Sequence, residues 1–476
     1  MYPMIVFLIS VLFTAVILLL FREKSEKSFN SFLKALTLLF CGVGFFRFML
    51  SDSFIYVING GFVNGVEYNN TDYLQLILRW GYYLSYAVLP MAIFFKSRMF
   101  KNVASYVCLP FAILSAIYFK DYMAYFLDPK GNGLHLATKF RYAYFIFELV
   151  LAISIPLLLQ IREKHYFRVS DGKEWRNFLI SLPCIAFIMM PVYAPQAILG
   201  YAYESPKLFG TFHIVWLVVL LAFILGLYYF FRFKNYQQRY MICIFLTVVL
   251  FFHYDSLYLK GFTFKRLPVQ LCNIASYFYL IAIPFRLKKM FHFCFLTNIV
   301  GALIAILAPD FAVGNFGFWT VHYIFEHSLV MAVPALAMGL RIFPRLEKKS
   351  LLYMWVGFTA YFVFVFTIGT IVNGYASRIG YKVNYFYMFD LDMAFDYFPF
   401  LTFTGEYCYQ FGRFEVYPLV IFIVYAGFQL FCLLFYALVK VFYRMEDDHL
   451  NLRLSSITLY EERTGKQSRR PKFFID

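Results

Sequence analysis

Charged residues are scarce in this 476-residue sequence. Asp, Glu, Lys and Arg together make up 15%, whereas hydrophobic residues make up 62% and aromatic residues 23%. Long uncharged runs recur along the whole chain, and a water-soluble protein could not bury that much apolar surface. The composition therefore excludes a soluble globular domain and predicts an all-α, polytopic transmembrane helical bundle.

Paired metal-binding and disulfide patterns are also missing. The eight cysteines are scattered singly and form no CxxC pair, which excludes a zinc ribbon and a disulfide framework. The segment HYIFEH at residues 322–327 follows neither of the His-Glu zinc motifs. The sequence predicts no metal and no cofactor.

Acidic residues are few beside basic ones, 27 against 43, so the formal net charge is +16. No basic patch interleaved with stacking aromatics accompanies this charge, and nucleic-acid binding is not expected. In a membrane protein, such charge reflects orientation and attraction to anionic head groups. Membrane lipids are the expected environment or substrate, and the sequence leaves the protein partners unknown.

Apolar runs of about 20 residues, the length that crosses about 30 Å of hydrocarbon, number roughly thirteen. The predicted spans lie near residues 4–21, 32–50, 73–95, 102–119, 142–160, 177–199, 209–231, 240–257, 267–285, 290–308, 316–340, 350–372 and 416–440.

Basic residues are concentrated in alternate loops. One set of loops, together with the C-terminal tail, holds about 30 of the 43 basic residues, and the other set holds about 11. Cytoplasmic loops carry the positive excess, so the N-terminus is predicted outside and the C-terminus in the cytoplasm. Met1-Tyr2-Pro3 lacks the positive charge that precedes a secretory signal, and the first run is expected to be retained. The prediction is a multi-pass protein of the cell membrane.

Loop content divides the chain into three parts. Residues 1–232 form an N-terminal membrane region of about seven spans, residues 240–440 form a six-span domain rich in polar groups, and residues 441–476 form a basic cytoplasmic tail. No convincing internal repeat relates the halves. Because many transporters are built from repeats, this absence weakens a transporter interpretation.

Polar residues interrupt two of the predicted spans. The ninth opens with Leu267-Pro268 and carries Cys272 and Asn273, whose amide is costly to bury unpaired. The eleventh carries His322, Glu326 and His327. At about 100° per residue, His322 and Glu326 share one helix face, and His327 is rotated about 140° from His322.

A thiol in apolar surroundings is a poor nucleophile unless a base lies within hydrogen-bond reach. Cys272 and His327 fall at similar depth in the predicted topology. A histidine is the natural base for such a thiol.

Residues from about 240 to 441 resemble the YwaF-like integral membrane proteins. The family pattern is matched by Leu267-Pro268-Val269-Gln270-Leu271-Cys272-Asn273, then Pro309-Asp310, then VHYIFEHSLV with His322 and His327, then Asn384-Tyr385. Order and spacing are kept together. The pattern is similar, more distantly, to the eukaryotic transmembrane acyltransferase that forms ether phospholipids and to the androgen-induced membrane hydrolases.

The resemblance implies a Cys nucleophile and a His base that act on lipid acyl chains. Those catalytic roles fall on Cys272 and His327. The predicted topology places Cys272 and His327 in the outer half to the middle of the membrane. Asn273, His322, Asn384 and Tyr385 are the predicted substrate-binding residues, with Asn273, Asn384 and Tyr385 as candidate donors to the oxyanion.

Two alternatives to a lipid acyltransferase or lipid-ester hydrolase stay open. The same polar groups would line the pathway of a lipid or small-molecule transporter. A non-catalytic membrane scaffold, with the N-terminal spans binding another protein, would have a dry interior without a lipid-sized cavity.

Overall fold

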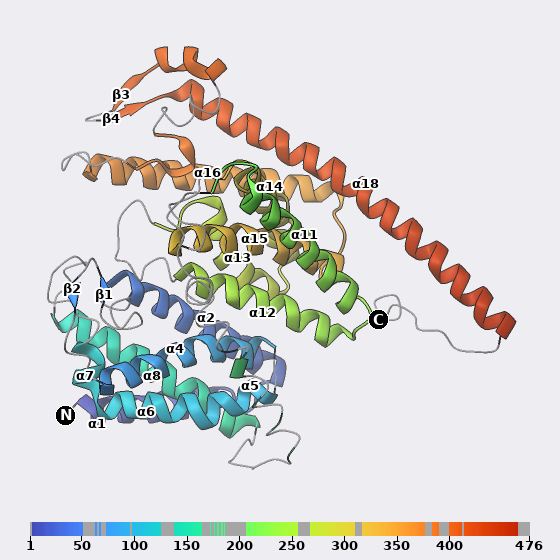
Figure 1. Cartoon of the computed structure of the whole chain (residues 1–476). Coiled ribbons are helices and arrows are strands. Elements are labelled where there is room, and N and C mark those ends of the chain that lie inside the picture. The colour runs from blue at the N-terminus through green and yellow to red at the C-terminus, as the bar shows by residue number, and fades with distance from the viewer. Residues whose placement is uncertain are drawn as a thin grey trace. The chain divides into compact units, whose positions relative to one another are not determined.

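The computed structural model of the chain is mostly helical (Figure 1). It describes residues 2–50, 62–63, 66–67, 73–95, 98–124, 138–163, 172, 176, 179, 182–183, 185, 206–255, 267–309, 317–376, 383–389, 399–411 and 414–464. The chain forms two compact units. The first comprises Met1–Gly200 with Ile244–Arg266, and the second comprises Tyr201–Cys243 with Leu267–Asp476.

The first unit is a helical bundle with one short hairpin. Its elements are α1 (Tyr2–Leu20), α2 (Glu26–Leu50), β1 (Phe62–Val63), β2 (Val66–Glu67), α4 (Tyr73–Phe94), α5 (Arg98–Val103), the π-helical turn η1 (Ala104–Cys108), α6 (Leu109–Ile117), α7 (Phe119–Ala124) and α8 (Thr138–Glu163). Helix α8 packs along α1, and α4 packs against α2 and α6. Glu148 is buried here and accepts a hydrogen bond of 2.8 Å from the Tyr122 hydroxyl.

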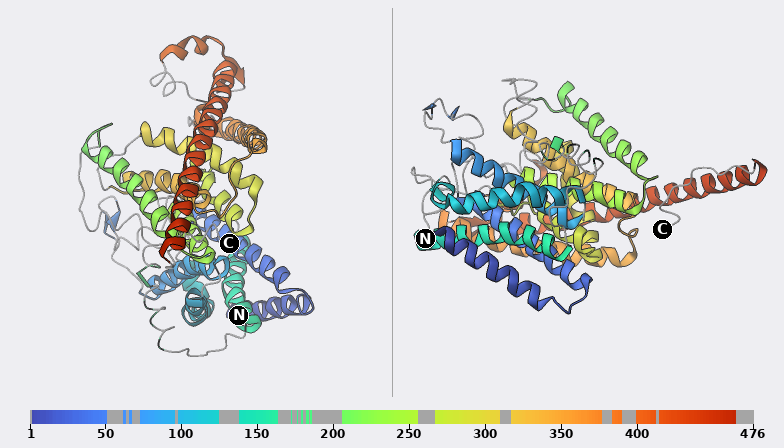
Figure 2. Two further views of the ribbon diagram at one scale, coloured as in Figure 1. Left: turned by 90° about the vertical axis from the view of Figure 1, so that its right-hand side faces the viewer. Right: turned by 90° about the horizontal axis from the view of Figure 1, so that it is seen from below.

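The second unit contains the longer helices. Its elements are α11 (Thr211–Phe231), the start of α12 (Tyr236–Asp255), α13 (Leu271–Phe285), α14 (Lys288–Leu307), α15 (Phe318–Gly339), α16 (Lys348–Ala376), the 3-10 turns η5 (Tyr385–Tyr387) and η6 (Pro399–Glu406), the antiparallel pair β3 (Tyr409–Phe411) and β4 (Phe414–Val416), and α18 (Pro418–Thr464). Figure 2 gives two further views of the same elements.

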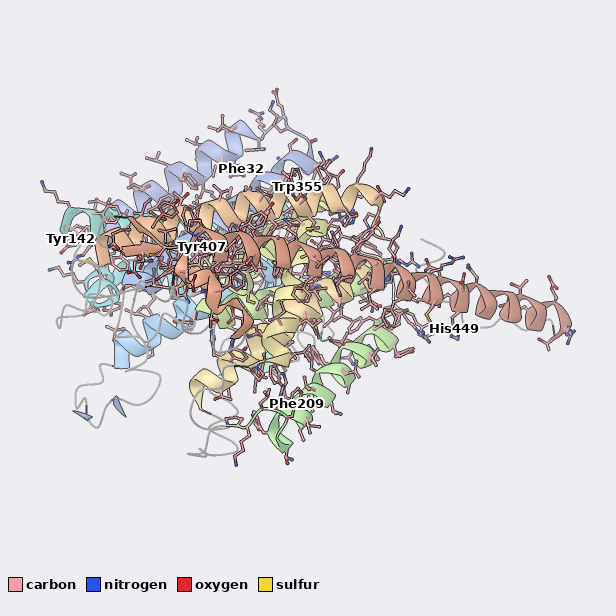
Figure 3. All side chains as sticks on the ribbon, turned by 90° about the horizontal axis from the view of Figure 1, so that it is seen from above. Phe32, Tyr142, Phe209, Trp355, Tyr407 and His449 are labelled. Carbon is pink, nitrogen blue, oxygen red and sulfur yellow. The ribbon has the colours of Figure 1, made fainter. Side chains whose placement is uncertain are left out.

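Helix α14 is the centre of the second unit. It contacts α13, α15, α16 and α18, and 12 of its 20 residues are buried. A helix that is apolar on every side suits such a position. By contrast, α11 and α18 expose most of their apolar side chains, and Figure 3 shows Trp355 on the similarly exposed helix α16. Lipid would cover these faces.

Eight helices of the described part are long and apolar enough to cross a membrane: α1, the continuous run α5–α6, α8, α11, α14, α15, α16 and α18. Twelve of the thirteen predicted spans fall on a described helix, but α4 and α13 hold shorter apolar stretches, and α2 and α12 are not among the eight. The span at 177–199 lies almost entirely outside the described residues. The helical membrane class is therefore confirmed, and the count of thirteen and the orientation stay predictions.

Two helix boundaries differ from the predicted spans. Helix α13 begins at Leu271 rather than at 267, so its 15 residues extend only about 22 Å. Helix α18 does not end near residue 440 but runs 47 residues to Thr464, about 70 Å at 1.5 Å per residue. Most of the predicted C-terminal tail is thus a continuation of the last helix.

Candidate functional site

The N-terminus of α13 is fixed by contacts with the segment at residues 383–389. The Gln270 side chain donates to the Asn384 carbonyl over 3.3 Å and accepts from the Phe386 amide over 3.0 Å. On the same turn, the Tyr361 hydroxyl of α16 donates to the Val269 carbonyl. The first turn of α13, which carries Cys272 and Asn273, is therefore held in place from two sides.

Cys272 lies in this first turn and faces α14. Gly301 of α14 has no side chain, and a Cβ at that position would lie 3.2 Å from Leu271 Cδ2 and 4.0 Å from Cys272 Sγ. The absence of a side chain at Gly301 lets the two helices approach closely. Cys272 is also near the Glu326 carboxylate, whose negative charge would oppose a thiolate.

A buried polar network joins α13 to α15. Asn273 Nδ2 donates a hydrogen bond to Glu326 Oε1, and Glu326 Oε2 lies 3.5 Å from His322 Nε2. Glu326 is 4% exposed and His322 is 5% exposed. The sequence pattern singled out all three residues but predicted no role for Glu326. The pairing of Glu326 with His322 could have been predicted, because the two residues lie one turn apart on the same helix face.

His327 points along a different face of α15. Its Nδ1 lies 2.8 Å from the Tyr323 carbonyl oxygen, and its ring packs on the Tyr323 ring with centroids 4.1 Å apart. A carbonyl can only accept, so Nδ1 carries the proton and Nε2 is left as a hydrogen-bond acceptor. Tyr323 is itself fixed by donating to the Ala305 carbonyl of α14.

The predicted pair Cys272 and His327 lies on neighbouring helices of one unit, α13 and α15. Within the described residues, no hydrogen bond joins the two side chains. The catalytic assignment of Cys272 and His327 stays a prediction.

Asn384 and Tyr385 lie beside the start of α13 through the contacts of Gln270. The Asn384 side-chain oxygen accepts from the Phe389 amide over 3.0 Å, and Tyr385 is buried. Val383, the residue before Asn384, is held by two hydrogen bonds between its backbone and the Asn373 side chain of α16. The segment thus braces α13, a role for Gln270 and Asn373 that the sequence pattern did not reveal.

These features define a class: a multi-pass helical membrane protein whose second unit contains a buried Asn-Glu-His network beside a cysteine. Residues 208–438 match the TMEM164 family, a eukaryotic transmembrane family. The matched range starts just before α11, and the family that matches is TMEM164 and not the YwaF-like proteins that the sequence pattern suggested. No curated protein and no solved structure matches the chain.

Proposed function

We propose that this protein is a lipid acyltransferase or lipid-ester hydrolase of the cell membrane, with Cys272 as nucleophile and His327 as general base. The observation that carries the proposal is the buried polar network of Asn273, Glu326 and His322 beside Cys272. Ionisable and amide groups inside a membrane bundle are expensive and mark functional sites by default. The resemblance to ether-phospholipid acyltransferases and membrane hydrolases gives the reaction type.

In the proposed reaction, Cys272 Sγ attacks the carbonyl carbon of a lipid ester while His327 Nε2 takes the thiol proton. The tetrahedral intermediate collapses, the lipid alcohol leaves with the proton from His327, and an acyl thioester remains on Cys272. A hydroxyl of a second lipid, or water, then attacks the thioester and regenerates the thiol. The hydrogen bond from His327 Nδ1–H to the Tyr323 carbonyl supports this role, because it leaves Nε2 as the basic nitrogen.

Asn273 is the proposed oxyanion donor. Its amide has two N–H groups, and the bond to Glu326 uses one of them. Glu326 and His322 would then fix the amide plane rather than react. Asn384 and Tyr385 are proposed to bind substrate from the turn that contacts the start of α13 through Gln270.

The test is a comparison of the lipids of cells that express the wild-type chain, Cys272→Ala or Cys294→Ala. Cys294 is a buried cysteine of α14 and serves as the matched control. Loss of lipid remodelling in Cys272→Ala alone is the expected result. Equal lipid remodelling by all three proteins would show that Cys272 is not the nucleophile.

A lipid or small-molecule transporter is the second candidate, favoured by the buried Glu326–His322 pair, which could couple transport to protons. Such a transporter would lose uptake in Glu326→Gln and keep it in Cys272→Ala. The acyl-transfer proposal requires Cys272 in every turnover.

A further inference from the structure

A cluster of three arginines lies where the helices of the second unit leave their apolar runs. Arg232 follows the end of α11, and Arg341 and Arg345 lie between α15 and α16. We call Arg232, Arg341 and Arg345 the arginine cluster. Arg239, at the start of α12, reaches the same end of the bundle and donates to the Leu340 carbonyl over 2.7 Å. This is the basic end of the helices, where head groups of a membrane lie.

Helix α18 contributes the acidic partners of the arginine cluster. Glu446 accepts from Arg345 Nη2 and from the Tyr228 hydroxyl, and Asp447 pairs with Arg341 and with Arg345. The Arg345 guanidinium also stacks on the Tyr443 ring, 3.6 Å from its centroid. Glu446 thus occupies a position between a phenol and a guanidinium, two groups that donate to oxyanions.

The acidic partners do not satisfy the cluster. Arg341 and Arg345 pair with the two carboxylates, and Arg232 lies beside the Tyr228 hydroxyl that donates to Glu446. Buried donors at Arg232 Nε, Arg341 Nε, and Arg345 Nε and Nη1 have no acceptor in the part of the chain that the structure describes. Arg232, only 8% exposed, is held over the Tyr229 ring at 4.4 Å. Buried guanidinium donors without acceptors are costly, so the cluster favours a further oxyanion.

We propose that the arginine cluster binds a phosphate monoester, in exchange with the Glu446 carboxylate. With Glu446 displaced, three guanidiniums and Asp447 leave two positive charges, which a phosphate monoester of about −1.5 to −2 matches. Arginine binds phosphate oxygens through paired N–H donors, and the Tyr228 hydroxyl would donate to the same group. The phosphate belongs either to a lipid head group or to a soluble ester.

The experiment is native mass spectrometry of the purified full-length protein in detergent. The probe is dioleoyl phosphatidic acid, and dioleoyl phosphatidylcholine has the same chains without net charge. The expected result is binding of phosphatidic acid at least about tenfold tighter than phosphatidylcholine, and about tenfold weaker binding to Arg341→Gln/Arg345→Gln. The control Lys348→Gln/Lys349→Gln removes two exposed charges from the start of α16 and should bind as wild type.

Glu446→Gln tests the exchange without removing an arginine. It should bind phosphatidic acid several-fold tighter, because the competing charge is gone. If millimolar inorganic phosphate displaces the lipid, the cluster recognises the phosphate alone. If inorganic phosphate leaves lipid binding unchanged, the cluster recognises a lipid head group. Equal binding of the two lipids by wild type, or unchanged affinity in Glu446→Gln, would overturn the proposal.

Discussion

Asn273 has a structural reason to lie in an apolar helix, because its amide donates a hydrogen bond to a buried carboxylate, that of Glu326. Its amide donates to Glu326, and Glu326 also faces His322, so each polar group has a partner inside the bundle. Burying any of them alone would cost more than leaving it in water. The three side chains therefore act as one unit at the residue scale.

Interdependence of Asn273 and Glu326 is the first prediction. Asn273→Ala and Glu326→Ala should each lower the free energy of unfolding, and the double variant should lose about 1–3 kcal/mol less than the sum of the two. Denaturant unfolding of the protein in detergent micelles measures this coupling. Strictly additive losses would mean that the hydrogen bond contributes nothing.

Packing at Gly301 provides the second prediction. Gly301→Val places a side chain against Leu271 and Cys272, and this overpacking should cost about 1–3 kcal/mol of stability. The control is Gly226→Val on α11, where a Cβ meets no atom within 4 Å. Thermal unfolding should show a lower midpoint for Gly301→Val alone. Equal midpoints would contradict the close approach of α13 and α14.

At the scale of elements, hydropathy predicted where helices lie but not where they begin and end. Leu267 and Pro268 are apolar and were included in a span, yet the helix starts at Leu271. The Val269 carbonyl accepts from Tyr361, and the Gln270 side chain bonds to the 383–389 segment. Glu446 and Asp447 are charged residues within the apolar helix α18, and their partners Arg345 and Arg341 lie 101 and 106 residues earlier in the chain. Such long-range contacts leave no local sequence signal.

The third prediction concerns the C-terminal turns of α18, which the sequence placed in a tail. Because Arg345 pairs with Glu446 from a partly buried position, Arg345→Gln should loosen the helix beyond that point. Hydrogen exchange of residues 446–464 should become several-fold faster, while residues 420–436 keep their protection. The control Lys349→Gln should leave both segments unchanged. Equal exchange in wild type and Arg345→Gln would show that the ion pair does not hold the helix.

At the scale of the whole molecule, composition was sufficient to predict a helical membrane protein, and the eight apolar helices confirm it. The candidate residues Cys272, Asn273, His322 and His327 could be found because polar groups stand out in apolar spans. Their partners could not, since Asn273 and Glu326 are 53 residues apart and meet only through the packing of α13 on α15. The TMEM164 match covers residues 208–438, so the N-terminal helices are left without a comparison.

Orientation is the fourth prediction, and Cys408 provides a natural probe because it is exposed and belongs to a loop predicted outside. A membrane-impermeant maleimide should label Cys408 in intact cells, with Cys408→Ser as the control. A cysteine introduced at Ser25, in the first predicted cytoplasmic loop, should react only after permeabilisation. The reverse pattern would invert the whole topology.

The central claim is that Cys272 carries the acyl group, and the most direct measurement is the mass of the peptide that contains it. Purified protein in nanodiscs of a phospholipid with deuterated acyl chains is quenched in acid, digested and analysed. We expect a deuterated acyl adduct on Cys272 that hydroxylamine removes, and we expect His327→Ala to slow its formation by about 10²–10⁴-fold. Turnover of lipid with an unmodified Cys272, or the same adduct on Cys294, would contradict it.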